Sequence, residues 1–419
     1  MARLLHKTWQ AAGATGLPRR HRKPCNYAAY VPDMLRERRI RLDGDVAAEV
    51  AEAEAAVARL DEGASVLVNT EVLARLLLRA ESVASSRIEG LEIGGRRLLQ
   101  AEAARGMGQS VDFTAKEVLG NVDAMAWASE AAPPAISTDH MLEIHRRLFL
   151  GNRLEAQAGR LRTDQNWIGG SDYNPCSAVF VPPPPEMVPG LLEDLCDFCN
   201  DDSLPTIAQA ALAHAQFETI HPFADGNGRT GRVLIHLVLQ RRGLARRVLP
   251  PVSLVLATWS RDYVDALMTT RYEGPEESQS AHDGLNNWVA LFAAACKRAV
   301  SDAEDFERRA RDLQQGWRRR AGPVRARSAL DLLIERLPGA PVITVGAAAQ
   351  LIGRSFQATN GAVARLAETG ILAPVTIGRR NRAFEASEVI QEFTRLERQL
   401  ASPVGDTRRS APSRRVPRR

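Results

Sequence analysis

The stretch that decides the fold runs His221-Pro222-Phe223-Ala224-Asp225-Gly226-Asn227-Gly228-Arg229-Thr230-Gly231-Arg232. An apolar run over 206–220 precedes it, and a second apolar run over 233–243 follows it. Pro205 suits the first turn of an entering helix, because the N–H that proline lacks has no helical partner there. His221-Pro222 ends that helix, since the residue before a proline avoids helical geometry. The stretch is therefore predicted to be a loop between two helices.

The residue types in this loop favour a phosphate site with a base beside it. Glycines at 226 and 228 allow positive φ and close approach of the backbone to a ligand. The helix expected from Arg229 points its free N–H groups at the loop, and Arg229 and Arg232 share one helix face. His221 can serve as general base, and Asp225 can hold Mg²⁺. An ordinary tight turn with solvated arginines is the alternative, but the fixed spacing of all these residue types argues against it.

The pattern His-x-Phe-x-Asp-Gly-Asn-Gly-Arg-x-x-Arg resembles the signature of Fic-domain proteins at every defined position. Members of that family are mainly protein adenylyltransferases, which move AMP from ATP to a hydroxyl side chain of a target protein. The resemblance implies that His221 deprotonates the target hydroxyl, that Phe223 anchors the loop in the core, and that Asp225 holds Mg²⁺. It implies that Asn227 and the loop N–H groups bind the α-phosphate and that Arg229 and Arg232 bind the β- and γ-phosphates. The implied nucleotide-binding residues are Asp225, Gly226, Asn227, Gly228, Arg229, Thr230, Gly231, Arg232 and Tyr263.

One position separates two branches of that family. The Doc branch, which phosphorylates its targets, typically carries lysine where this chain has Gly228. This difference favours AMP transfer.

A second motif lies far upstream, where an apolar helical pattern over 69–86 ends in Ser85-Ser86-Arg87-Ile88-Glu89-Gly90. Gly90 alone is explained by a helix C-terminus. Ser85, Glu89 and Gly90 also match the Fic inhibitory motif, in the class whose inhibitory helix precedes the catalytic domain. Arginine and carboxylate make a bidentate, charge-assisted pair. A Glu89–Arg232 pair would therefore prevent Arg232 from holding the γ-phosphate.

Two short β-prone runs within 166–181 flank a turn-rich centre, and four prolines follow them. They predict a β-hairpin, whose free edge can pair with an extended peptide. The resemblance implies that this hairpin is the flap that docks the target protein. A plain surface hairpin is the alternative.

The C-terminal region has a different organisation. Helices expected near 330–337, 344–353 and 355–368, followed by strands at 371–377 and 382–385, predict a winged helix-turn-helix. Ser355, Gln357, Asn360 and Arg365 lie on the expected recognition helix, and Arg379, Arg380 and Arg382 lie in the wing. The segment 345–382 is accordingly a candidate for DNA contact, with protein–protein contact as the alternative.

Composition is that of a globular protein: 419 residues, 45% hydrophobic, with a net charge of +5. The fold class expected is mainly α, a Fic-type helical core with a small β-hairpin flap and a C-terminal winged helix domain. We expect an N-terminal helical region with the inhibitory helix (1–110), a catalytic core (111–300), a charged helical linker (301–327), a winged helix (328–399) and a disordered basic tail (400–419). Residues 1–33 are expected to form a loosely ordered arm. Five cysteines with no evident pairing, no apolar leader and no membrane span make a reducing cytoplasm the expected location.

Two functions follow. The first is an autoinhibited protein adenylyltransferase that uses ATP and Mg²⁺ to modify Tyr, Thr or Ser hydroxyls of a target protein and of itself. The second is a DNA-binding regulator whose Fic core senses nucleotide. A de-AMPylating enzyme is a further alternative, and a homodimer is a possible assembly.

Overall fold

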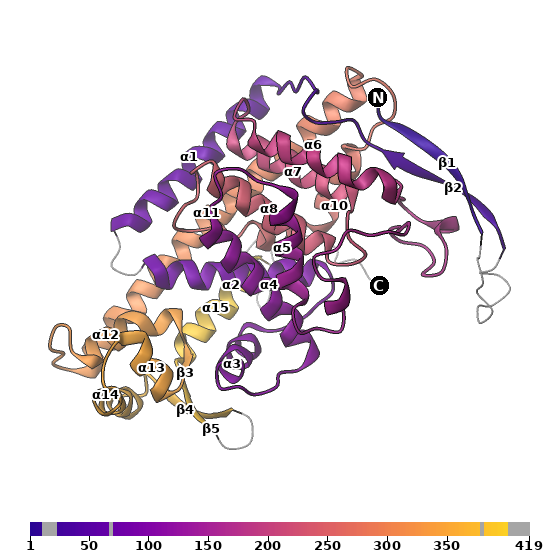
Figure 1. Ribbon diagram of the computed structural model, residues 1–419. Coiled ribbons are helices and arrows are strands. Elements are labelled where there is room, and N and C mark those ends of the chain that lie inside the picture. Colours follow the sequence, from indigo (N-terminus) through magenta and orange to yellow (C-terminus); the bar gives the residue numbers. More distant parts are fainter. Residues whose placement is uncertain (11–22, 67–69, 378–380, 401–419) are drawn as a thin grey trace. The chain divides into compact units, whose positions relative to one another are not determined.

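The computed structural model describes residues 1–10, 23–66, 70–377 and 381–400 (Figure 1). Within it the chain divides into two compact units. The first comprises 1–52, 127–243 and 261–294, and the second comprises 53–126, 244–260 and 295–419. The helices α1 (Gly44–Val66), α4 (Phe113–Ala131) and α11 (Gln279–Ala321) each contribute several residues to both units. No helix among the described residues is both long enough and apolar enough to cross a bilayer.

The centre of the first unit is the helix pair α7 (Thr206–Ile220) and α8 (Asn227–Arg241). Every residue of α7 is buried, as expected for a helix that is apolar on all sides. Gly231 lets the two helices approach closely. A Cβ atom there would lie 2.9 Å from Glu218 Oε1 and 3.0 Å from Phe217 Cδ1. Around this pair, α6 (Val188–Asn200) packs on α7, and α5 (Thr138–Phe149) packs on α8. Helix α10 (Ser260–Thr269) completes the unit's helices.

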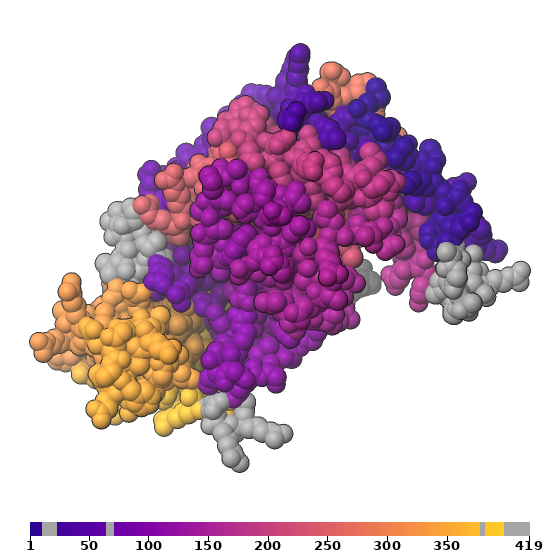
Figure 2. Space-filling view, in the orientation of Figure 1, coloured from indigo at the N-terminus to yellow at the C-terminus, as the bar shows by residue number. Residues whose placement is uncertain are grey.

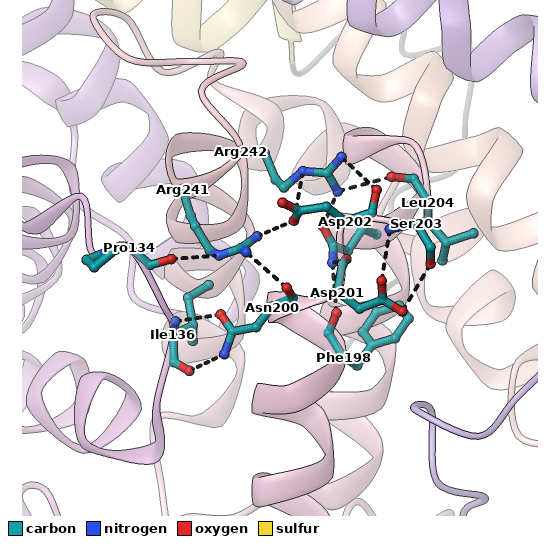
Figure 3. Close-up of polar contacts among 11 residues, drawn as sticks. Pro134, Ile136, Phe198, Asn200, Asp201, Asp202, Ser203, Leu204, Arg241 and Arg242 are labelled. Carbon is teal, nitrogen blue, oxygen red and sulfur yellow. Dashed lines mark hydrogen bonds and ion pairs between the residues drawn. The ribbon is translucent and has the colours of Figure 1, made fainter.

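The C-terminal end of α8 is held by a network of polar contacts (Figure 3). Arg241 donates to the carbonyls of Pro134 and Asn200 at 3.3 and 3.0 Å and pairs with Asp202 at 2.7 Å. Arg242 donates to the carbonyl of Leu204 at 3.0 Å and also reaches Asp202. These contacts join the end of α8 to the turn that leads into α7.

The expectation of a loosely ordered N-terminal arm is wrong for its described residues. β1 (Arg3–Trp9) and β2 (Cys25–Val31) pair antiparallel, with register from Arg3↔Val31 to Trp9↔Cys25 (Figure 1). The N–H of Tyr30 donates to the carbonyl of Val181 at 2.9 Å, and Cys25 forms a disulfide with Cys176. These partners are distant in sequence, and the N-terminal residues themselves are basic and polar. The local pattern therefore did not predict the strands.

The disulfide was not predicted, because the five cysteines show no pairing pattern. Disulfides are typical of oxidising environments. The disulfide therefore does not fit the expected reducing cytoplasm, and the location stays a prediction.

The second unit combines α2 (Thr70–Ile88), α3 (Gly95–Gly106) and α9 (Val252–Thr258) with a C-terminal module over 329–400. In Figure 2 the orange and yellow atoms of this module form one contiguous group. Its elements are α12 (Ala329–Arg336), the 3₁₀ turn η5 (Leu337–Gly339), β3 (Val342–Ile343), α13 (Val345–Ile352), α14 (Phe356–Glu368), β4 (Ala373–Ile377), β5 (Asn381–Glu385) and α15 (Ser387–Leu400).

The helices and strands expected in this module are all present. Thr344 and Ser355 cap α13 and α14 by accepting N–H groups from Ala347 and Ala358. The strands form a three-stranded antiparallel sheet in the order β3-β5-β4. β3 and α15 were not predicted. The identification of the module as a winged helix stays a prediction.

The module is packed on α2 and α3 within its own unit. α15 contacts both helices, and Arg96 on α3 makes two hydrogen bonds to the buried carboxylate of Glu385, at 3.2 and 2.7 Å. Arg79 on α2 pairs with Glu102 and donates to the carbonyl of Gly339 at 2.9 Å. The helix that ends in the proposed inhibitory motif is thus anchored to the C-terminal module.

Candidate active site

The signature loop, residues 221–226, joins α7 to α8 through two left-handed residues, and the rest of the motif, 227–232, forms the start of α8. His221 follows the last turn of α7 with φ 49° and ψ 60°, and its N–H donates to the carbonyl of Phe217 at 2.9 Å. Gly226 precedes α8 with φ 76°. A Cβ at Gly226 would lie 2.7 Å from Phe149, so both conformation and space require glycine there.

Phe223 anchors the loop in the core, as the resemblance implied. Its side chain is fully buried and stacks on the His145 ring, with centroids 3.8 Å apart and planes 3° apart. The Asn227 side chain closes the loop from the other side. Its Oδ1 accepts the Phe223 N–H and its Nδ2 donates to the Phe223 carbonyl, both at 2.8 Å. Asn227 therefore holds the loop, and its predicted phosphate contact stays a prediction.

The N-terminus of α8 faces this loop. The first internal helical bond joins the Thr230 N–H to the Gly226 carbonyl at 3.0 Å. The N–H groups of Asn227, Gly228 and Arg229 come before it, at the helix positions that have no intrahelical acceptor. Arg229 and Arg232 project from the same helix and are both buried. This combination of a helix N-terminus and two guanidinium groups fits a polyphosphate.

Asp225 lies at the exposed tip of the loop. Its Oδ1 accepts the Gly226 N–H at 2.6 Å, which orients the carboxylate. No group of three or more His, Cys, Asp or Glu side chains within the described ranges could enclose a metal ion. One exposed carboxylate nevertheless fits Mg²⁺, which is commonly bound by one or two carboxylates together with water and substrate phosphates.

His145 on α5 is a site residue that the sequence analysis missed. Its Nδ1 accepts the Gly159 N–H at 2.9 Å, so Nε2 carries the proton and donates to the Asp225 carbonyl at 3.0 Å. Burial lowers the pKa of His145 to about 4, so the ring is neutral at pH 7. The residue lies in an ordinary amphipathic helix and carries no motif, so no sequence signal distinguished it.

Arg162 and Asn166 also escaped the analysis. Both side chains donate to the His221 carbonyl, at 2.9 and 3.3 Å, and Asn166 donates to the Phe223 carbonyl at 3.0 Å. Arg162 precedes the expected hairpin and belongs to no motif, so the sequence assigned it no role.

The residues of this site lie within a match to a known protein family. The model of the Fic/DOC family matches residues 135–239, and the Fic/DOC family N-terminal model matches residues 47–130. The chain carries a Fic domain.

The relatives of this Fic domain include a protein adenylyltransferase of Caenorhabditis elegans, fic-1, which is 42% identical over 131 residues. That match covers 30% of this chain and 23% of the relative. A probable protein adenylyltransferase of Aquifex aeolicus is 30% identical over 171 residues, covering 40% of this chain and 49% of the relative. The chain thus spans less than half the length of either relative. A solved Fic family protein from Desulfovibrio desulfuricans aligns with a TM-score of 0.49 and 22% identity, over 82% of this chain and 94% of that one.

The expected flap of the Fic domain is a folded loop and not a regular β-hairpin. Isolated bridges pair Ile168 with Phe180 and Ser171 with Asn174, and the turn η3 (Pro175–Ser177) lies between its two sides. Positive φ at Gly169 and Gly170 and the 3₁₀ turn interrupt the strands that were predicted. Beside this loop is a cleft of about 630 Å³, lined by residues 156, 157, 160–167, 172 and 224.

Two further predictions concern Tyr263 and the inhibitory motif. Tyr263 is 3% exposed, and its hydroxyl lies 2.9 Å from His214 Nε2, so it sits in the core beneath the Fic loop. Its contact with adenine stays a prediction. Ser85 is buried near the end of α2, and Gly90 closes that helix with φ 78°. Glu89 belongs to the second unit and Arg232 to the first, and their pairing stays a prediction.

Proposed function

We propose that the chain is a protein adenylyltransferase that moves AMP from ATP to a Tyr, Thr or Ser hydroxyl of a target protein and of itself. The observation that carries the proposal is the signature loop. It places His221 at the C-terminus of α7 and two buried arginines at the N-terminus of α8, with Asn227 closing the loop between them. The names of the relatives matched by the Fic domain support the same reaction.

In this reaction His221 takes the proton from the target hydroxyl. The hydroxyl oxygen bonds to the α-phosphorus, the bond from that phosphorus to the bridging oxygen breaks, and pyrophosphate leaves. Arg229, Arg232 and the first N–H groups of α8 stabilise the negative charge of the phosphates. Asp225 would hold Mg²⁺, which supplies further charge neutralisation when bound.

The target segment is proposed to dock along the loop 166–181, beside the cleft that ends at Ala224 of the signature loop. An extended peptide would pair through its main chain with exposed backbone of this loop, such as Gly169 and Gly170.

Autoinhibition is part of the proposal. Glu89 would pair with Arg232 and prevent that guanidinium from holding the γ-phosphate, because one bidentate carboxylate occupies the same donors. The same glutamate could position water for removal of AMP, so the enzyme is also a candidate for the reverse modification.

The experiment compares His221→Ala and Glu89→Gly with the unchanged chain, using ATP labelled on the AMP moiety. We expect His221→Ala to abolish transfer and Glu89→Gly to raise it at least about tenfold, because a freed arginine restores productive binding of the phosphates. Glu92→Gly, which removes an exposed carboxylate three residues further on, is the control and should leave labelling unchanged. Equal labelling by Glu89→Gly and the unchanged chain would disprove inhibition. Absence of labelling in every variant would disprove the transfer reaction.

A regulator that binds DNA through 345–382 is less well supported. Arg365, expected on the recognition helix, donates to the carbonyls of Ala321 and Pro323 and is thereby engaged within the chain. Arg379 and Arg380 lie outside the described residues, and Arg382 packs its guanidinium on Phe384. DNA binding stays a prediction, and a gel shift over a salt series tests it.

A further inference from the structure

The backbone of His221 adopts a conformation that histidine does not favour. With φ 49° and ψ 60° it lies in the left-handed region, which ordinarily suits glycine. Such residues persist only where the surrounding structure holds them, and they occur frequently at functional sites. The contacts that hold His221 are therefore of interest for its proposed role as a base.

Two side chains supply those contacts: Arg162, which precedes the flap loop, and Asn166, which begins it. The carbonyl groups of residues 220, 221 and 223 all accept hydrogen bonds from them. Arg162 donates to the carbonyls of His221 and Ile220, at 2.9 and 3.4 Å, and its backbone N–H donates to the carbonyl of Pro222 at 3.0 Å. Asn166 donates to the carbonyls of His221 and Phe223. The carbonyl groups of the four consecutive residues 220–223 are thus all held by hydrogen bonds from Arg162 and Asn166.

The hydrogen bonds of the Arg162 guanidinium all go to backbone carbonyl groups. The residue is 6% exposed, and beyond residues 220 and 221 it donates to the carbonyls of Asp164 and Pro183. Within the described part of the chain its hydrogen bonds reach only carbonyl oxygens. A buried cation without a carboxylate partner is costly, so its retention calls for a reason.

The planar fork of arginine explains why this residue type is needed. Its donors point in several fixed directions in one plane and can reach separate carbonyls at once. Lysine has a single ammonium group and cannot span the same acceptors. The contact set also links the flap side, through Pro183 and Asp164, to the residue that would act on the target hydroxyl.

We propose that Arg162, assisted by Asn166, is a positioning residue for His221, holding its backbone in the left-handed conformation that aims the imidazole at the target hydroxyl. The inference rests on the proposed function for the role of His221, but the contacts themselves do not. Within the described ranges, the hydrogen bonds of the Arg162 side chain reach residues 164, 183, 220 and 221 and none of the residues 225–232.

The test uses Arg162→Lys in the Glu89→Gly background. We expect kcat for AMP transfer to fall roughly tenfold to a hundredfold, since misplacing a reacting group by about 1 Å has effects of that size. KM for ATP should stay within about twofold, because the α8 N-terminus and its arginines are unchanged. Asn166→Ala should give a smaller loss of the same kind. If Arg162→Lys fails to fold, Asn166→Ala carries the test.

Arg241→Lys is the matched control. Arg241 also donates to two backbone carbonyls (Figure 3), and its side chain is largely buried. It lies at the other end of α8, roughly 20 Å along the helix at about 1.5 Å per residue. This variant should lose a comparable number of hydrogen bonds and keep kcat. A loss of kcat in both variants would show that general destabilisation explains the effect, and the proposal would be withdrawn.

A second measurement does not depend on activity. In protein labelled with ¹³C-histidine, the His221 ring resonance, assigned by its loss in His221→Ala, should shift in Arg162→Lys and Asn166→Ala but not in Arg241→Lys. Unchanged kcat and an unchanged resonance in folded Arg162→Lys would overturn the inference. A shifted resonance in a protein that transfers no AMP under any condition would leave the positioning role standing and refute only the proposed reaction.

Discussion

At the scale of single residues, His145 shows how a side chain without a motif can support the site. Its ring stacks on Phe223 and connects the backbone of Gly159 to that of Asp225. Both hydrogen bonds require the neutral tautomer, since Nδ1 must accept and Nε2 must donate. Protonation would remove the acceptor and place a charge in the core beneath the loop.

We predict that His145 makes stability depend on pH. Its pKa is about 4 in the folded protein, below the ordinary value of 6.5, so the unfolded chain takes up the proton first as pH falls. The contribution to stability is therefore complete above about pH 6.5 and is lost on acidification toward pH 4, at roughly 1.4 kcal/mol per pH unit. Burial lowers the pKa of His214 to about 3 and adds a second contribution of the same sign.

Urea denaturation at several pH values between 4 and 7 measures this dependence. His145→Gln should reduce the slope of the unfolding free energy against pH by about 1.4 kcal/mol per pH unit, the value for one proton. His6→Gln, which changes an exposed histidine, should leave the slope unchanged. An identical slope in the unchanged chain and in His145→Gln would contradict the prediction.

At the scale of elements, the N-terminal strands are joined to the flap loop. β2 is linked to η3 by the disulfide between Cys25 and Cys176, which are 151 residues apart, and to Val181 by the Tyr30 N–H. Tyr30 also packs on Phe180, whose ring lies under the guanidinium of Arg271 at 3.5 Å. The proposed docking loop therefore has a covalent support that originates outside the family-matched residues.

Removing that support should lower stability. We predict that the pair of substitutions Cys25→Ser and Cys176→Ser decreases the unfolding free energy by about 2–4 kcal/mol, the usual effect of a disulfide that closes a long loop. A dithiol reductant should lower the urea midpoint of unfolding of the unchanged chain to that of the double variant. The midpoint of the double variant should not change. If five free thiols were titrated in the unreduced protein, the disulfide would be absent in solution.

The elements also show what the sequence could predict. The helix pair around the signature loop and the order of the C-terminal elements follow from local periodicity, and both were predicted. β1, β2, β3 and the Cys25–Cys176 pair depend on partners far away in the chain, so no local pattern revealed them. His145, Arg162 and Asn166 were missed because their hydrogen bonds go to backbone atoms. Every residue type has these backbone groups, so the sequence does not show which side chains bind them.

At the scale of the whole molecule, the second unit gathers α2, α3 and the C-terminal module into one body. A shared apolar cluster joins Leu99 and Ala104 of α3 to Val342, Ile377 and Ile390 of the module. The Arg96–Glu385 pair lies beside that cluster. Folding of α3, which follows the inhibitory motif in the chain, is thereby coupled to a region outside both family models.

Neighbouring arginines on α3 allow this coupling to be measured. Arg96 pairs with a carboxylate whose side chain is 7% exposed, whereas Arg97 pairs with Asp112, which is 45% exposed. We predict that Arg96→Ala lowers the unfolding free energy by roughly 2 kcal/mol, because it leaves a buried carboxylate short of donors. Arg97→Ala should cost at most about 1 kcal/mol, as expected for exposed ion pairs. Equal effects in urea denaturation would indicate that the module does not depend on this contact.

The left-handed backbone at His221 has a consequence for how an inactive protein should be prepared. A residue with a Cβ pays about 1–2 kcal/mol to adopt that conformation, whereas glycine adopts it without that cost. Alanine at 221 would remove the imidazole and keep the backbone penalty, but glycine would remove both. The imidazole at position 221 is therefore kept at a cost in folding stability. We expect His221→Gly to be inactive and more stable than His221→Ala, so it is the better variant for trapping a bound target.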